Sequence, residues 1–235
     1  MSQMKLLSVN VAQPREVSYV DRRGREKTTS TGIFKEPAPG RPMLRTLNLD
    51  GDAQADLNGH GGIYKAVYVY TVENYRYWAN ELGRTDFKAA GQFGENFTVE
   101  GMADDAIRIG DVFRVGDALV EVTQPRVPCF KLGVRMGIEG FHKQFAESCR
   151  VGFYLRVLEE GEVGAGDALV GVGEPAGPMT VREIMHLLYF DPDNLEDAKK
   201  AMDIEALSPG WKQSFSDRIE KALGGGGREV PTDRS

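Results

Sequence analysis

Glycine-marked turns divide roughly the first 175 residues into short runs of β-branched and aromatic residues. Runs of this composition between turn residues are typical of strands. They lie at 6–11, 17–20, 66–70, 112–115, 118–123 and 153–158. Many short strands with few helices predict a mostly β fold of the α+β class, in which the strands form a barrel or a strongly curved sheet.

Two of these regions have the pattern of a β-hairpin. In DVFRVGDALVEVTQP, the residues on either side of Gly116-Asp117 alternate in the way that paired antiparallel strands do. A second hairpin is indicated where the run at 17–20 is followed by RRGRE, with Gly24 in the turn.

Helices are predicted at two places within the strand-rich region. In TVENYRYWANELG, Thr71 is a suitable N-cap, Tyr75 and Trp78 fall on one face, and Gly83 ends the pattern. A weaker helical pattern covers 139–147.

The segment GVGEPAGPM at 171–179 interrupts the strand pattern, and the chain beyond it is helical. Thr180 and Glu183 have the spacing of a capping box, and further helices are predicted at 194–201 and 209–223. We therefore expect a mostly β domain at 1–172, a linker at 173–178, a three-helix domain at 179–223 and a flexible tail at 224–235.

The composition of the chain disfavours nucleic-acid-binding, membrane-spanning and disulfide-rich proteins. The chain has 29 Lys and Arg against 35 Asp and Glu, a net charge of −6, which disfavours general binding to nucleic acid. It has no run of 18 apolar residues, and its first residues indicate a strand instead of a signal peptide. With two cysteines, we expect a reduced, cytoplasmic protein that binds no membrane; a homodimer stays open.

The most informative segment is QPRVPCFKL at 124–132, directly after a predicted strand. Pro125 and Pro128 stiffen this loop and hold Cys129 between Arg126 and Lys131. Positive potential favours the thiolate, which attacks electrophiles and ligates metals. A buried structural cysteine is the alternative, of about equal weight on composition alone. Cys149, which lacks such neighbours, is interpreted as a packing residue.

Three further segments contain candidate binding groups. His60 lies beside Gly61 and Gly62, where a flexible backbone can approach a ligand; a surface turn is the alternative. Asn96 in GENF either binds a ligand or stabilises its own turn. Hydroxyl groups at 28–31, including Thr31, together with Lys35 suit a phosphate, although a solvated strand has the same pattern.

Taken together, these segments resemble the MOSC family, named after the C-terminal domain of molybdenum cofactor sulfurases, and most closely its YiiM-like branch. The resemblance rests on TSTGIFK, DLNGHGG with AVYVYTVENYRYW, GQFGENFTVEG, IRIGDVFRVGDALVEVTQPRVPCFKL and RVGFYLRVLEEGEV, in the order of the family. It implies a MOSC-type β-barrel with a few peripheral helices, followed by a three-helix module.

The resemblance also implies a bound molybdenum cofactor, a pterin that carries a phosphate, with Cys129 as the metal ligand. It implies cofactor-binding roles for Thr31, Lys35, Arg126, Lys131, Gly61 and Gly62. His60 and Asn96 are implied to orient substrate or supply a proton. At the level of the family it further implies pyridoxal phosphate binding.

The implied activity is the reduction of N-hydroxylated bases and other hydroxylamines to amines, a form of detoxification. Two cysteines cannot hold an iron–sulfur cluster, so an external reductase must supply the electrons. Two alternatives stay open: a sulfur carrier through a Cys129 persulfide, and a module that binds the cofactor without turnover.

Overall fold

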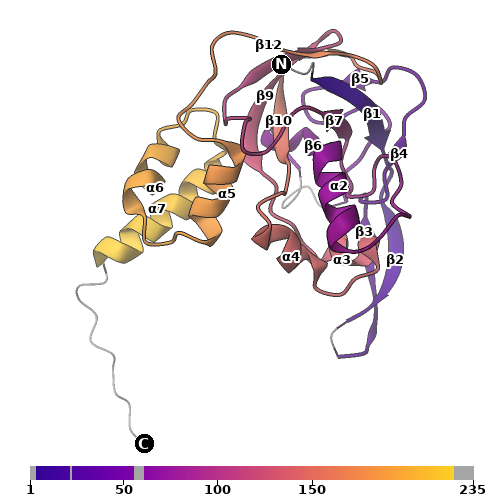
Figure 1. Ribbon diagram of the computed structural model, residues 1–235, viewed down its shortest axis with the longest axis horizontal. Coiled ribbons are helices and arrows are strands. Elements are labelled where there is room, and N and C mark those ends of the chain that lie inside the picture. Colours follow the sequence, from indigo (N-terminus) through magenta and orange to yellow (C-terminus); the bar gives the residue numbers. More distant parts are fainter. Residues whose placement is uncertain (1–3, 22, 56–60, 225–235) are drawn as a thin grey trace, which may run out of the picture.

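The computed structural model describes residues 4–21, 23–55 and 61–224. Eight strands form the main sheet, in the order β12-β8-β9-β10-β6-β7-β1-β4 (Figure 1). Their bounds are β1 (Lys5–Val11), β4 (Glu36–Pro37), β6 (Val67–Thr71), β7 (Phe97–Glu100), β8 (Val112–Val115), β9 (Ala118–Pro125), β10 (Phe153–Glu159) and β12 (Leu169–Gly171). Two-stranded sheets are formed by β2 (Arg15–Val20) with β3 (Glu26–Thr31) and by β5 (Met43–Leu44) with β11 (Gly161–Glu162).

The main sheet is curved but not closed among the described residues. Five strands separate β12 from β1 in the sheet, yet an isolated bridge joins Lys5 to Ala168, and the Leu169 amide donates to the Met4 carbonyl at 3.0 Å. The predicted α+β fold with a strongly curved sheet is confirmed, and the sheet curves like an incompletely closed barrel. The strands at the two ends of the order, β12 and β4, are short, with three and two residues.

Both predicted hairpins are confirmed. Strands β8 and β9 pair in antiparallel fashion up to Val115 and Ala118, and Gly116 in the turn has a φ of 55°. Strands β2 and β3 pair from Arg15–Thr31 to Val20–Glu26, and Gly24 has a φ of 72°. Glycine adopts these left-handed conformations without the penalty that a Cβ atom brings.

The described residues of the first part of the chain also contain four helices: the short η1 (Ile63–Lys65), α2 (Val72–Glu81), α3 (Phe130–Met136) and α4 (Phe141–Glu147). Helix α2 packs against β6 and β7, and α3 packs against α4. The hydroxyl of Thr71 accepts from the Asn74 amide at 3.2 Å, which confirms the predicted N-cap of α2. The pattern at 139–147 becomes α4. Helix α3 was not predicted, because the two prolines before it favour a stiff loop.

The last part of the chain is the predicted trio of helices, α5 (Val181–Tyr189), α6 (Leu195–Met202) and α7 (Pro209–Gly224). The capping box is present: Thr180 Oγ1 accepts from the Glu183 amide, and the Glu183 carboxylate accepts from the Thr180 amide at 2.7 Å. The helices stand beside β9 and β10 (Figure 1), and the Val181 amide donates to the Ile107 carbonyl at 2.9 Å.

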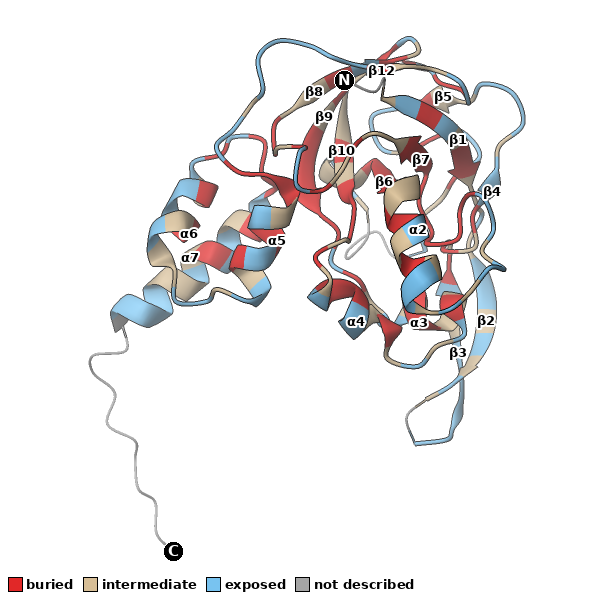
Figure 2. Cartoon of the chain, viewed as in Figure 1, coloured by how far each residue is buried: buried red, intermediate tan, exposed pale blue. Residues whose placement is uncertain are grey.

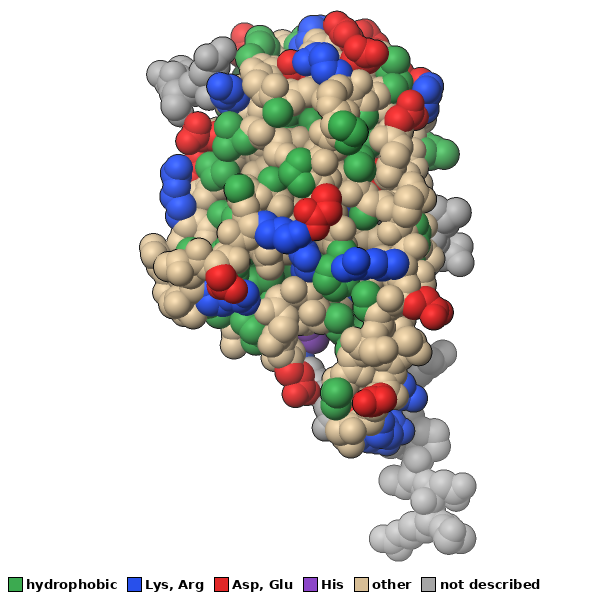
Figure 3. Space-filling model, turned by 90° about the vertical axis from the view of Figure 1, so that its right-hand side faces the viewer, with side chains coloured by type: hydrophobic (Ala, Val, Ile, Leu, Met, Phe, Trp, Pro, Cys, Tyr) green, Lys and Arg blue, Asp and Glu red, His purple; other side chains and the backbone are tan. Residues whose placement is uncertain are grey.

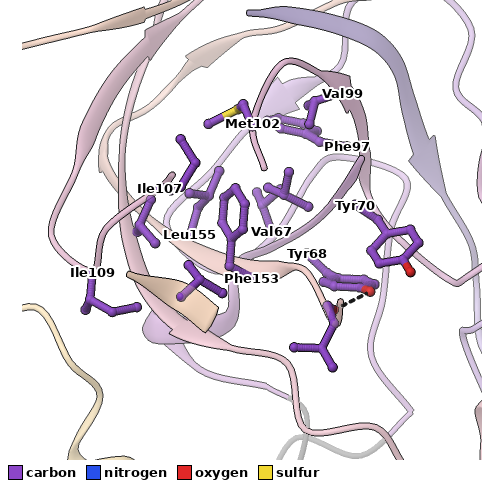
Figure 4. Close-up of a cluster of buried hydrophobic side chains, with 14 of the residues drawn as sticks. Val67, Tyr68, Tyr70, Phe97, Val99, Met102, Ile107, Ile109, Phe153 and Leu155 are labelled. Atoms are coloured by element: carbon purple, nitrogen blue, oxygen red, sulfur yellow. Dashed lines mark hydrogen bonds between the residues drawn. The ribbon is translucent and has the colours of Figure 1, made fainter. Parts of the chain in front are cut away.

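One hydrophobic core extends through both parts. It surrounds β6, β7, β9 and β10, where most residues are buried (Figure 2), and it continues to Val181, Ile184 and Met185 of α5. Figure 4 shows its centre, in which Val67, Phe97 and Leu155 meet and the Tyr68 hydroxyl donates to the Val151 carbonyl at 2.9 Å. The strands and helix α5 therefore share one continuous apolar core.

The surface is mixed in charge. On the face shown in Figure 3, basic and acidic side chains are interspersed among apolar ones. Among the described residues, no helix combines the length and apolar character needed to cross a lipid bilayer.

Candidate functional site

A cavity of about 100 Å³ opens where several distant segments converge. Its lining comes from the end of β3 with residues 32–35, the loop at 52–55, β6, the loop at 94–96, the exit of β9 and the start of α3. Cys129, Asn96, Thr31, Lys35, Arg126 and Lys131 all line it. The structure thus brings together six of the residues selected from the sequence.

Two glycines allow the backbone segments to approach closely at this cavity. A Cβ atom on Gly32 would lie 2.7 Å from the Ala53 carbonyl oxygen. Gly94 has a φ of 80°, and its Cβ would lie 2.5 Å from the Ile33 side chain. Since real Cβ atoms do not approach backbone this closely, a side chain at Gly32 would push the 52–55 loop outward and deform the cavity.

Cys129 lies at the end of the stiff loop and is the N-cap residue of α3. Its side chain is half-buried and borders a second cavity of about 470 Å³, which shares Lys65 and Tyr154 with the first. The thiol therefore stands where two cavities meet. Cys149 differs: it is buried in the core, and burial raises the pKa of its thiol.

The first cavity is rich in cations. Among its described lining residues are Lys35, Lys65, Arg126 and Lys131, against a single carboxylate, that of Asp52. Positive charge in a confined, partly desolvated space favours an anionic ligand. The cavity therefore has the electrostatics of a site for phosphate or another anion.

Arg126 is 6% exposed, and its guanidinium forms no ion pair with any carboxylate of the described residues. Its Nη1 donates to the Phe93 carbonyl at 2.7 Å, and the guanidinium lies 4.3 Å from the centre of the Tyr68 ring. Burial raises the pKa of Tyr68 far above its usual range, so this phenol stays neutral beside the cation. A buried cation that only neutral groups contact among the described residues is a strong binding point for an anion.

Lys35 is buried as well, but its charge is already balanced. Its Nζ lies 2.5 Å from Asp52 Oδ1, which also accepts from the Ala12 amide at 2.8 Å. Burial lowers the pKa of Lys35, while the Asp52 carboxylate opposes that change. Sequence patterns gave no sign of this ion pair, because 17 residues separate its partners.

Asn96 belongs to the same network. Its Nδ2 donates to Asp52 Oδ2 at 2.9 Å and to the Asn10 carbonyl at 3.2 Å, and its Oδ1 accepts from the Tyr68 amide at 3.1 Å. The side-chain amide is thus occupied by protein groups at both ends. This geometry fits a residue that positions Asp52 and the strands better than one that contacts substrate.

Neighbouring Glu95 holds the 91–98 loop in place. Its carboxylate accepts from the Tyr75 hydroxyl, from Thr98 Oγ1 at 2.7 Å and from the Gly91 amide at 2.8 Å. Burial raises the pKa of Glu95, and these donors oppose the change. Glu95 is not a sequence-predicted site residue, yet its contacts set the position of Asn96.

The other selected residues take varied positions. Thr31 is buried, and its Oγ1 accepts from the Ile33 amide at 3.2 Å; Lys131 Nζ donates to the Ser30 carbonyl at 2.9 Å. Gly61 and Gly62 line the second cavity. His60 lies outside the described residues, so its role stays a prediction.

Comparison with known proteins decides the family. The MOSC domain model matches residues 56–170, and the model of the YiiM-like, 3-alpha helix domain matches residues 179–222. YflK of Bacillus subtilis is 38% identical over 218 residues, which cover 93% of this chain and 96% of that protein. The chain belongs to the MOSC family, in its YiiM-like branch.

Two further relatives extend this assignment. The crystal structure of YiiM from Geobacillus stearothermophilus superposes with a TM-score of 0.75 at 32% identity, covering 92% of this chain and 99% of that one. A protein of Gibberella moniliformis named reductase is 31% identical over 161 residues, 68% of this chain but 28% of its own length.

MOSC domains are associated with molybdenum cofactor binding, and the residues of this chain fit that group. Cys129 offers a soft thiolate donor of the kind that molybdenum accepts. The Arg126 cation, which has no carboxylate partner among the described residues, suits the negative charge of a pterin phosphate together with Lys65 and Lys131. The cavity thus combines the two groups that the cofactor needs, a thiolate for the metal and cations for the phosphate.

Tyr68, Tyr154, Asp52 and Lys65 complete the cavity and were missed by the sequence analysis. Tyr68 and Tyr154 lie in strands whose pattern indicates only burial. Their rings are 5.4 Å apart, which places them side by side on neighbouring strands β6 and β10. Only the pairing of these strands identifies them as site residues.

Proposed function

We propose that this MOSC protein is an oxidoreductase that binds a pterin molybdenum cofactor in the cationic cavity, with Cys129 as the protein ligand to the metal. When bound, the cofactor supplies two-electron redox chemistry and accepts oxygen from substrates. The observation that carries the proposal is the position of Cys129 at the junction of a cationic cavity and a second, larger one.

In this proposal Arg126 holds the anionic part of the cofactor, assisted by Lys65 and Lys131. Lys35 contributes through Asp52: the pair fixes the loop at 52–55, which forms one wall of the cavity. Thr31 lies on the neighbouring segment, and in this proposal its hydroxyl binds a phosphate oxygen. Nothing in the matched family or relatives supports pyridoxal phosphate at this site.

The proposed substrates are N-hydroxylated compounds, including hydroxylaminopurine-type bases. Reduction of R–NHOH to R–NH₂ breaks the N–O bond, consumes two electrons and two protons and releases water. A separate reductase supplies the electrons, because a chain with two cysteines holds no iron–sulfur cluster. His60 is the proposed proton donor, since imidazole titrates near neutral pH. The Gibberella moniliformis relative is named reductase, and that name describes a reduction by that protein.

The test compares Cys129→Ser with Cys149→Ala in protein purified from a host with ample molybdenum. Loss of the metal ligand should abolish the oxidation of a reduced mediator dye by 6-hydroxylaminopurine. Cys149→Ala should keep most of this activity, because Cys149 packs in the core away from both cavities. Equal activity in the two folded variants would refute the assignment of Cys129.

Metal content separates the alternatives. A sulfur carrier would hold a persulfide on Cys129 and no molybdenum, whereas a binding module would hold molybdenum and cofactor without oxidising the dye. The proposal requires both molybdenum and dye oxidation.

A further inference from the structure

The second cavity is a cleft between the strand-rich part and the three-helix module. Gln124, Val127, Pro128, Cys129 and Tyr154 line one side, and Leu188 of α5 and Trp211 of α7 contribute from the helices. Its volume of about 470 Å³ falls in the ~300–1,000 Å³ range of small-molecule sites.

The two cavities at Cys129 differ in charge. Among the described residues that line the cleft, Lys65 is the one charged side chain, whereas five charged side chains line the cationic cavity. The other described side chains of the cleft are uncharged: they are mostly aromatic and aliphatic, together with Gln124, Ser208 and Ser214. The cleft therefore suits a neutral, planar ligand, one end of which would reach the thiol of Cys129.

Gln124, one of the residues that line this cleft, has a polar atom without a partner among the described residues. The residue is 3% exposed, and its Oε1 is buried with no hydrogen-bond donor among the described residues. Buried polar atoms nearly always have partners, and an orphaned acceptor destabilises a protein unless a ligand supplies the missing donor. The missing partner of Gln124 is thus an N–H or O–H group.

A β-bulge accounts for the orientation of Gln124. Tyr154 pairs with Gln124, but the next residue, Leu155, pairs with Val122, so Thr123 is the extra residue of β9. Strict alternation would send Gln124 into the core with Val120 and Val122. Bulges re-aim side chains near functional sites, and here Gln124 borders the cleft.

From these observations we infer that the cleft is the substrate-binding site, that Gln124 accepts a hydrogen bond from the exocyclic N–H of a planar aromatic amine or hydroxylamine, and that Trp211 and Tyr154 flank the ring. This inference rests on the proposed function for its substrate class. It assigns the three-helix module a part in substrate binding, because Trp211 and Leu188 belong to that module.

The experiment measures binding instead of turnover. Calorimetric titration of the purified protein compares 6-aminopurine with 6-methylpurine, which has the same shape and lacks the exocyclic N–H. Wild type should bind 6-aminopurine about fivefold more tightly. Gln124→Met, which keeps the length of the side chain, should reduce that preference to near unity. Gln144→Met, at an exposed position of α4 outside both cavities, should leave the preference unchanged.

Thermal unfolding of the same variants provides a second measure. Because Gln124→Met removes an unpaired acceptor from a buried position, its unfolding temperature without ligand should equal or exceed that of wild type. Trp211→Phe should weaken the binding of both purines by a similar factor and leave the preference between them intact.

Three results would overturn the inference: no binding of either purine to wild type, the same preference in wild type and Gln124→Met, or a markedly lower unfolding temperature for Gln124→Met. The dye assay reports separately on the proposed function. A protein that reduces hydroxylaminopurine without the Gln124-dependent preference would refute this inference alone. Selective binding without dye oxidation would refute the proposed reaction alone.

Discussion

Arg126 and Lys35 show why the partner of a buried cation decides its role. Both side chains are almost fully buried in the same cavity. Lys35 is neutralised by Asp52, whereas Arg126 is held by a carbonyl oxygen and an aromatic ring. Lys35 is therefore first a structural residue, and Arg126 is the stronger candidate for holding an anionic ligand.

This difference predicts opposite effects of substitution. Lys35→Met leaves the Asp52 carboxylate buried and unpaired, which should lower the free energy of unfolding by about 3–5 kcal/mol. Arg126→Met should cost about 1–3 kcal/mol, since it leaves one carbonyl unsatisfied, but it should reduce molybdenum retention more strongly. Urea unfolding of cofactor-free protein and metal analysis test both expectations. If Arg126→Met kept full molybdenum content, its assignment to cofactor binding would be wrong.

The buried thiol of Cys149 should make the free energy of unfolding depend on pH. Cys149 is buried, it has a φ of 50° after α4, and burial raises the pKa of its thiol above the ordinary value. A raised pKa in the folded state means that its stabilising contribution is complete below the unfolded pKa and declines as pH rises through the folded pKa. Wild type should therefore lose stability relative to Cys149→Ala as the pH rises above the pKa of the unfolded thiol and through that of the folded one. Denaturant unfolding at several pH values measures this, and a constant difference between the two proteins would contradict it.

At the scale of elements, local residue patterns predict the hairpins and caps well. Gly24 and Gly116 determine their turns through their own backbone conformations, and Thr71 and Thr180 cap helices through residues three positions away. Helix α3 was not predicted, because no side chain caps its start and tertiary contacts determine where the chain after Pro128 lies. Its C-terminal signal was present in Gly137, which has a φ of 68°.

The capping box of α5 gives a prediction at this scale. Thr180→Ala removes the acceptor for the Glu183 amide and should cost about 1 kcal/mol. Thr180→Ser keeps the oxygen and is the matched control. Equal unfolding free energies for the alanine variant and wild type would show that Glu183 alone satisfies the helix start.

For the whole molecule, the three-helix module shares the core of the sheet. Val181, Ile184 and Met185 belong to the same buried cluster as the strands, and the Ile109 amide donates to the Met179 carbonyl at 3.1 Å. Separation of the two parts would expose this apolar surface to water.

The full chain should therefore unfold in a single cooperative transition. Differential scanning calorimetry should give one peak whose calorimetric and van't Hoff enthalpies agree. Two resolved peaks would mean that the module folds independently and that the shared core contributes little to its stability.

The sequence alone determined the local elements, the order of strand-rich and helical parts, and the segments that hold the candidate site. These depend on residues a few positions apart, through turn conformation, capping and periodicity. Tertiary structure decided which residues meet. It curved the sheet until residues next to β12 and β1 meet, paired Lys35 with Asp52 and engaged both ends of the Asn96 amide. It also placed Arg126 apart from every carboxylate of the described residues. It also directed Gln124 into a cleft with Trp211. Such contacts join residues far apart in the chain, and strand register and a single bulge determine them.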